Sequence, residues 1–236
     1  MRGYNLSDKP NSEEQYRMNY LVDDVLSLAD HFSHGKKFVL VAHDWGGAVA
    51  WAFGMVHPGM LERLVLINAP HPGVFARELR DNPAQQKASQ YMLLFRSPEA
   101  EAVLSADDHK ALRQALGDVW DKRFSDEDRR MYLEAWSRPG GLTGGLNWYR
   151  AARVGPPSGD APARSLVDPD RLPVIEVPTL VIWGEQDRAL TTGNLDGLDQ
   201  HVRNLTIRRV PDGTHWVVHE QPELITREIR AFITRS

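Results

Sequence analysis

Three polar residues follow apolar runs at points where strands are predicted to end: Asp44, Asp187 and His215. Asp44 comes directly after such a run, and small residues lie on either side of it. The spacing, with Ala42 and Gly46 as the small residues, is that of the Gly-x-Ser-x-Gly nucleophile elbow, with aspartate where serine usually stands. The pattern predicts a strand, a sharp turn and a helix, with Asp44 at the tip of the turn.

The order of these residues along the chain is nucleophile, acid, histidine, and the carboxyl ends of parallel strands meet at one edge of a sheet. Taken singly, an aspartate after a strand is more often a helix cap, and a lone Asp187 or His215 is more often an ordinary loop residue. The three in matching positions predict a catalytic triad. Glu185 is a rival for the acid role, but Asp187 lies where the triad acid is expected, and the segment 68–72 contains no carboxylate.

An aspartate nucleophile indicates a particular chemistry. Its reference pKa is about 3.9, so it is ionised at neutral pH without the help of a base. A carboxylate suits attack on an electrophilic sp³ carbon that bears a leaving group, which would leave an alkyl ester on Asp44. His215 would then remove a proton from the water that hydrolyses this ester, and Asp187 would orient the imidazole and stabilise its cation.

The elements needed to position these residues can be predicted from apolar patterning. A helix is expected from Ser12, and the continuously apolar runs 37–43 and 63–68 predict buried parallel strands around a helix over 47–57. This βαβ order indicates the α/β class. A strand over 179–183, an edge strand over 205–210 and a final helix over 222–233 complete the expected sheet.

The stretch between the two groups of strands reads as helices and loops. Ser97 is expected to begin one helix, and Ser125 with Asp128 predicts a capping box for a second that runs to about Trp136. Glycines over 140–145 predict a loop, and 155–172 reads as a linker. The expected organisation is a core over 1–70, a helical cap over 71–172 and the rest of the core over 173–236.

Bulk properties narrow the class of protein. The chain has 236 residues, a net charge of -4 and no cysteine, which excludes disulfides, thiolate catalysis and cysteine-ligated metal and disfavours nucleic acid as a partner. No apolar stretch approaches membrane-spanning length, and the N-terminus has no signal-peptide core. We expect a cytoplasmic protein that needs no cofactor or metal; the sequence leaves its oligomeric state open.

Four segments of the chain, 2–10, 43–47, 184–187 and 213–216, resemble the epoxide hydrolases of the α/β-hydrolase superfamily. The aspartate–tryptophan elbow is also similar to that of haloalkane dehalogenases. The resemblance covers nearly the whole chain. It implies a mostly parallel sheet with helices on both faces, an inserted helical cap, and a small apolar epoxide as substrate.

The expected cap separates these two families. The segment 146–150 resembles the cap segment that carries one substrate-activating tyrosine of epoxide hydrolases, and 90–98 resembles the segment that carries the other. By this resemblance, Tyr149 and Tyr91 would donate hydrogen bonds to the epoxide oxygen. Ring opening leaves a strongly basic alkoxide that a phenol can stabilise or protonate, whereas a halide needs only N–H donors. The alternative for each tyrosine is core packing with a bonded hydroxyl.

Four further side chains are expected to support the site. The backbone N–H of Trp45 would be an oxyanion-hole donor, and the rings of Trp45 and Trp148 would line an apolar substrate site. His43 is expected to support the elbow. His71, between two prolines, is expected to form a rigid hinge into the cap.

One part of the family pattern is not found. Members of the family usually begin with further strands and a His-Gly-x-Pro loop, and this chain contains no such motif. We therefore expect an N-terminally truncated chain that lacks on the order of 70 residues or more, since one βαβ unit takes about 30. Phe38–Ala42 would then be an edge strand, and one of two oxyanion donors would be lost, which can cost ~10²–10³ in rate. The alternatives are a dehalogenase-type hydrolase or a non-catalytic remnant that binds small apolar ligands.

Overall fold

Four parallel strands form the centre of the protein in the computed structural model, which describes residues 1–165, 168 and 171–234. The strands lie in the order β1-β2-β3-β4. Their bounds are β1 (Phe38–His43), β2 (Leu61–Ile67), β3 (Thr179–Gly184) and β4 (Leu205–Val210). Leu64 of β2 pairs with Leu40 on one side and with Thr179 on the other. The predicted strands are therefore confirmed to within two residues at each end, and β1 and β4 are the two edges of this sheet.

Helices cover both faces of the sheet, as the continuously apolar strands predict. One face packs against α1 (Met18–Ser33), α2 (Asp44–Val56) and α3 (Pro72–Asp81), and the other packs against α9 (Val217–Glu220) and α10 (Pro222–Ile233). The side chains of successive residues in a strand point to opposite faces of the sheet. Leu64 and Leu66 belong to the first core, and Val65 and Ile67 to the second.

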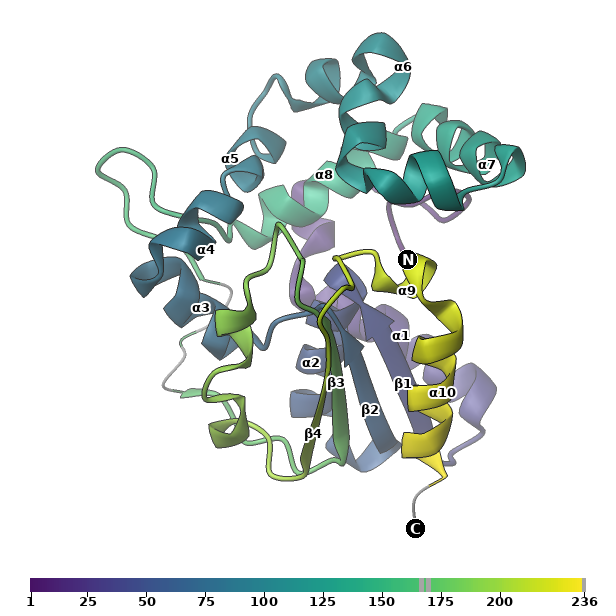
Figure 1. Cartoon of the computed structure of the whole chain (residues 1–236), viewed down its shortest axis with the longest axis vertical. Coiled ribbons are helices and arrows are strands. Elements are labelled where there is room, and N and C mark those ends of the chain that lie inside the picture. The colour runs from purple at the N-terminus through teal and green to yellow at the C-terminus, as the bar shows by residue number, and fades with distance from the viewer. Residues whose placement is uncertain (166–167, 169–170, 235–236) are drawn as a thin grey trace.

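The helices that follow α3 and precede β3 lie beyond the carboxyl ends of the strands, in the upper part of Figure 1. We call the segment from α3 to α8 the insert. After α3 it contains α4 (Pro83–Ala88), α5 (Tyr91–Phe95), α6 (Ala100–Leu116), a π-helical turn η3 (Val119–Arg123), α7 (Asp126–Ser137) and α8 (Gly141–Ala152). Four short 3₁₀ turns complete the described elements: η1 (Glu13–Tyr16), η2 (Pro58–Met60), η5 (Thr192–Leu195) and η6 (Leu198–Gln200).

Two predicted helix starts and one predicted loop are wrong. Ser12 makes no capping hydrogen bond, and Arg17 is extended, so the long helix begins only at Met18. Ser97 does not cap α6 either, because Glu99 occupies that position with a helical backbone. The glycines over 140–145 were expected to form a loop, but all except Gly140 lie inside α8. The capping box of Ser125 with Asp128 is confirmed.

Close backbone contacts explain the glycines of α8. An ideal Cβ on Gly144 would lie 2.3 Å from the carbonyl oxygen of Gly3, and Gly3 itself has a positive φ of 87°. The N-terminal segment can pack on α8 only because neither residue carries a side chain. These glycines therefore serve helix packing and not chain reversal.

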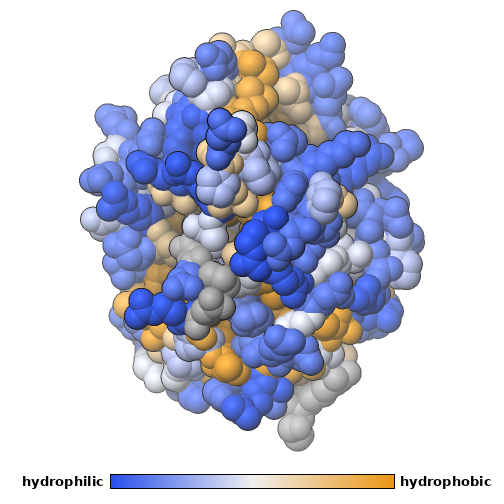
Figure 2. Space-filling model, turned by 90° about the vertical axis from the view of Figure 1, so that its left-hand side faces the viewer, coloured by the Kyte–Doolittle hydropathy of each residue, from blue (hydrophilic) through white to orange (hydrophobic). Residues whose placement is uncertain are grey.

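Hydrophilic residues cover most of the face shown in Figure 2, with smaller patches of hydrophobic residues among them. No helix among the residues that the structure describes is long and apolar enough to cross a membrane.

Candidate active site

Asp44 lies at the junction between β1 and α2, where the chain turns sharply. It is the first residue of α2 and has a φ of 53°, in the left-handed region that side chains other than glycine rarely adopt. Gly47, one turn into the helix, allows α2 to approach the end of β2, because a Cβ there would lie 2.1 Å from the Cβ of Ala69. The strained turn presents the Asp44 carboxylate at the carboxyl edge of the sheet.

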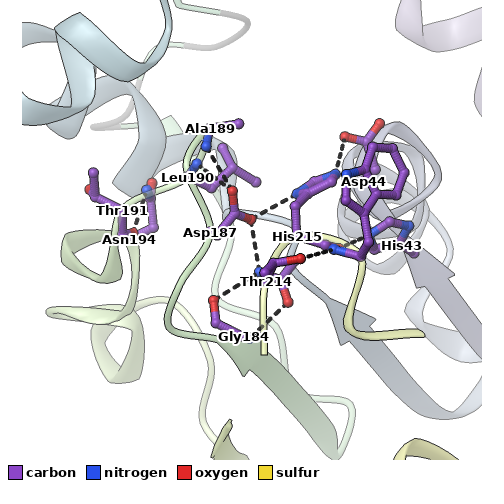
Figure 3. A network of polar contacts seen from close by, with 12 residues as sticks. His43, Asp44, Gly184, Asp187, Ala189, Leu190, Thr191, Asn194, Thr214 and His215 are labelled. Carbon is purple, nitrogen blue, oxygen red and sulfur yellow. Dashed lines mark hydrogen bonds and ion pairs between the residues drawn. The ribbon is translucent and has the colours of Figure 1, made fainter. Parts of the chain in front are cut away.

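His215 lies between two carboxylates that come from distant parts of the chain (Figure 3). Its Nε2 is 3.2 Å from an Asp44 oxygen, and its Nδ1 is 2.7 Å from Oδ2 of Asp187. The Asp187 side chain is fully buried, His215 is 11% exposed and Asp44 is 39% exposed. Of the two carboxylates, the one that a substrate can reach is therefore Asp44.

Asp187 is held by four hydrogen bonds, so both of its oxygens have partners. Oδ1 accepts from the backbone N–H groups of Ala189 and Leu190, at 2.8 and 2.9 Å. Oδ2 accepts from His215 and, at 2.8 Å, from the side-chain amide of Asn68. These bonds fix the orientation of the Asp187 carboxylate, and the carboxylate in turn orients the imidazole of His215.

Asn68 has a supporting role that is not predicted from the sequence, where it is only part of a segment without carboxylates. It follows β2, is fully buried and has a φ of 39°. Its amide donates to Asp187 and to the carbonyl of Gly184, and its oxygen accepts from the N–H of Gly184 at 2.8 Å. An amide at the carboxyl end of a buried strand was the available signal for this role.

His43 supports the site from the residue before Asp44. Its Nε2 is 2.8 Å from the backbone carbonyl of His215, so this nitrogen is the one that donates. Burial, together with the neighbouring His215, lowers the pKa of His43. A neutral imidazole thus holds the histidine loop against the elbow.

The carboxylates around His215 strongly affect its pKa, and His215 strongly affects that of Asp44. Burial would raise the pKa of Asp44, but the hydrogen bond from His215, its positive charge and the Trp45 backbone N–H lower that pKa to about 2. Burial would lower the pKa of His215, and the hydrogen bonds to Asp187 and Asp44 outweigh it and raise that pKa to about 10. The resting site is therefore an imidazolium between two carboxylates at neutral pH.

A buried glutamine of the insert holds the loop that carries Asp187. We call residues 187–194 the acid loop. The Gln85 oxygen accepts from the Thr191 backbone N–H, the Thr191 hydroxyl and the Asn194 amide, at 2.8–3.0 Å. Its nitrogen donates to the carbonyl of Ala189 and to the hydroxyl of Ser89. Gln85 is fully buried and lies on α4, just before the Tyr91 segment. No local pattern marks Gln85 as a structural residue, because its partners in the acid loop lie about a hundred residues away along the chain.

The insert brings two tyrosines to the nucleophile. Tyr91 lines a cavity together with Asp44, and its ring centre is 6.0 Å from that of Tyr149. Tyr149 packs edge-on against Trp45 at 5.1 Å. Burial and the charge of Asp44 raise the pKa of Tyr91, while burial, Tyr91 and Asp44 raise the pKa of Tyr149. Both phenols are therefore protonated at neutral pH.

Trp148 lies behind this group. It is 1% exposed, its ring contacts that of Trp45 at 5.7 Å, and its indole N–H donates to the carbonyl of Arg2. Arg150, in the same part of α8, forms a two-pronged ion pair with Glu101 of α6. Trp148 thus supports the aromatic group, whereas Trp45 also contributes to the cavity wall.

Comparison with known proteins places this geometry in a family. Residues 1–222 match the family model for the alpha/beta hydrolase fold. The chain is therefore a member of the α/β-hydrolase fold family, and it is a hydrolase.

Individual relatives are more specific. The chain is 37% identical, over 98% of its length and 78% of the relative's, to AB hydrolase superfamily protein YfhM of Bacillus subtilis. It is 32% identical to epoxide hydrolase 4 of Mus musculus over 99% of its length, and it spans 64% of that protein. A crystal structure of Bacillus megaterium epoxide hydrolase in complex with an inhibitor aligns with a TM-score of 0.90 and 32% identity, covering 99% of this chain and 82% of that one.

Proposed function

We propose that this chain hydrolyses epoxides to diols through an ester on Asp44, and that residues 71–172 act as a cap over the site. The observation that carries the proposal is a reachable carboxylate, Asp44, in contact with His215 and in the same cavity as the phenol of Tyr91. The similarity to epoxide hydrolases over nearly the whole chain supports it.

The first step forms one bond and breaks one bond. An Asp44 oxygen attacks a ring carbon, the carbon–oxygen bond of the epoxide breaks, and its electron pair goes to the ring oxygen. That oxygen takes a proton from Tyr91 or Tyr149, which gives a hydroxyl on the new alkyl ester. Because a halide is a weak base and needs no such acid, the two protonated phenols favour an epoxide over a haloalkane as the substrate.

Ester formation changes the charge around His215. Once Asp44 is esterified, its negative charge no longer stabilises the imidazolium, and the pKa of His215 falls. His215 then loses a proton and the tyrosinate regains one, so the protein side chains hold one proton fewer than at rest, and that proton is now on the substrate hydroxyl. The neutral imidazole that results is the base that the second step needs.

The second step returns the site to its resting state. His215 takes a proton from a water molecule as the water oxygen attacks the ester carbonyl. The backbone N–H of Trp45, which lies against the Asp44 carboxylate, stabilises the oxyanion that forms. When this intermediate collapses, the bond to the alkoxy oxygen breaks and that oxygen takes the remaining proton of the attacking water. The diol then leaves, and the Asp44 carboxylate is restored beside a protonated His215.

Trapping of the ester tests this proposal. In His215→Gln, steady-state diol formation should fall ~10²–10⁴-fold through loss of the base, while ester formation continues. Peptide mass spectrometry after addition of a simple epoxide should then find the peptide containing Asp44 heavier by the mass of one epoxide. Asp44→Asn is the matched control and should form no adduct.

Two results would contradict the proposal. One is an unmodified Asp44 peptide in His215→Gln under conditions where the wild-type chain forms diol. The other is release of halide from a haloalkane by a wild-type chain that forms no diol from any epoxide.

A further inference from the structure

The cavity at Asp44 continues along one side of α2, away from the polar network. The α2 residues on its wall are Asp44, Trp45, Ala48, Ala52 and Met55. This spacing places them on a single stripe of the helix. At 1.5 Å per residue, the stripe runs about 16 Å from Asp44 to Met55.

The walls of this cavity are apolar apart from one end. Asp44 and Tyr91 are the only lining residues with a charged group or a hydroxyl in the described part of the chain. The other walls come from prolines, aliphatic and aromatic side chains and methionines, with Met18 of α1 and Phe75 of α3 among them. The site therefore offers hydrogen bonds only at the reacting end, and a polar substituent further along would lose its hydration without gaining a partner.

Small side chains on α2 create the space. Trp51 and Phe53, on other sides of the same helix, are fully buried, whereas the stripe that faces the cavity carries Ala48 and Ala52. A leucine at either position would project into the cavity. Ala48 and Ala52 therefore leave space beside α2 that a ligand can fill.

The size of the cavity limits the shape of the occupant. Its volume is about 190 Å³. A dry engineered cavity of about 150 Å³ is enough for benzene. Here a similar volume is drawn out along about 16 Å of helix, so it suits a slender group better than a fused ring system.

We propose that the site selects epoxides with an unbranched, unsubstituted alkyl arm, and that this arm lies along α2 over Ala48 and Ala52. The inference rests on the proposed epoxide hydrolysis and adds the substrate class. The epoxide would be held between Asp44 and Tyr91, and the methionine at position 55 would set the chain length at which no further carbon is buried.

A homologous series of 1,2-epoxyalkanes tests the inference with the wild-type chain. Each methylene buried along α2 should raise kcat/KM roughly fourfold, until the chain reaches Met55 and the gain stops. Epoxides whose arm is a naphthyl ether, or an alkyl chain with a terminal carboxylate, should be poorer than the alkyl epoxide of equal length. A flat series, or a preference for the aromatic or charged arm, would overturn the inference.

Substitutions on α2 locate the arm. Ala52→Leu should lower the ratio of kcat/KM for a long chain to that for a short chain by tenfold or more, since leucine fills the middle of the cavity. Val56→Leu is the matched control, because Val56 is the next exposed position on the same helix, at 64% exposure, and should keep the wild-type ratio. An unchanged ratio in a folded Ala52→Leu would overturn the inference.

A second variant covers the case in which Ala52→Leu does not fold. Met55→Ala removes bulk instead of adding it, and the chain length at which the gain stops should increase. No shift of that limit would contradict the placement of the arm. Failure of the proposed epoxide hydrolysis can be told apart from failure of this inference. In the first case even the shortest epoxide would give neither diol nor an ester on Asp44, and the inference would then be wrong as well.

Discussion

Replacement of Gln85 is the change for which the structure gives the clearest quantitative expectation. Gln85→Met keeps an unbranched side chain of similar length but removes every hydrogen bond to the acid loop. The Thr191 N–H and the Ala189 carbonyl, both half-buried, would then be left without their side-chain partner. Each unsatisfied buried group costs about 1–3 kcal/mol, so we expect a loss of about 3 kcal/mol in the free energy of unfolding.

The same substitution should also affect the reaction. The acid loop carries Asp187 and the cavity residue Leu190, and α4 leads directly into Tyr91. A looser loop should therefore slow hydrolysis of the ester more than its formation, because hydrolysis depends on the orientation of His215. Rapid-quench measurement of ester and diol in one turnover separates the two rates, and urea unfolding gives the stability.

Gln90→Met is the matched control for Gln85→Met. Gln90 is an exposed glutamine of the same segment, and its change should lie within about 0.5 kcal/mol of the wild-type stability. Equal stability of the two variants would refute the hydrogen-bond argument. A destabilised Gln85→Met with the wild-type ratio of the two rates would show instead that Gln85 supports folding alone.

Three further predictions concern stability. Burial, and to a smaller extent His201, lowers the pKa of His71 to about 3, so below about pH 6.5 the unfolded chain binds a proton that the folded chain does not. The free energy of unfolding should therefore fall by up to about 1.4 kcal/mol per pH unit as the pH decreases from about 6.5. Urea unfolding of His71→Asn, which keeps an acceptor for the Gly73 N–H, should show a smaller loss over the same pH range. Gly47→Ala should lower the melting temperature by several degrees, because its methyl group meets Ala69, and an unchanged melt would contradict the close approach of α2 to β2. The pKa of His215 is raised to about 10, so its stabilising contribution is complete below about pH 6.5 and is lost as the pH rises through about 10. The difference in free energy of unfolding between wild type and His215→Gln should therefore decrease between about pH 6.5 and pH 10.

The parts of the fold that the sequence predicts well are those with a local cause. Continuous apolar runs indicate strands buried on both faces, and the strands around the elbow were placed to within two residues. The order of Asp44, Asp187 and His215 and their positions after strands were enough to predict that the three side chains meet, which they do at 3.2 and 2.7 Å. Each strand, and each site residue that follows a strand, is indicated by a short local pattern of residues.

The parts that the sequence could not supply depend on contacts across long stretches of chain. Asn68 and Gln85 look like ordinary polar residues, and their value comes from partners about a hundred residues away. The helix α8 was missed for a similar reason, since its glycines are set by packing against Gly3 and not by local turn chemistry. Propensity is a weak guide wherever tertiary packing decides the backbone.

The position of the insert has a consequence for how the chain folds. β2 ends at Ile67 and its partner β3 begins only at Thr179, so a segment of more than a hundred residues must close before that pair forms. Closing so long a loop costs entropy before any contact is gained, and folding slows as contacts become less local. The unit β1–α2–β2 can form early, with the apolar face of β2 still uncovered. We expect a folding intermediate at this stage that aggregates unless the helices of the insert associate first, so refolding yield should fall steeply with protein concentration.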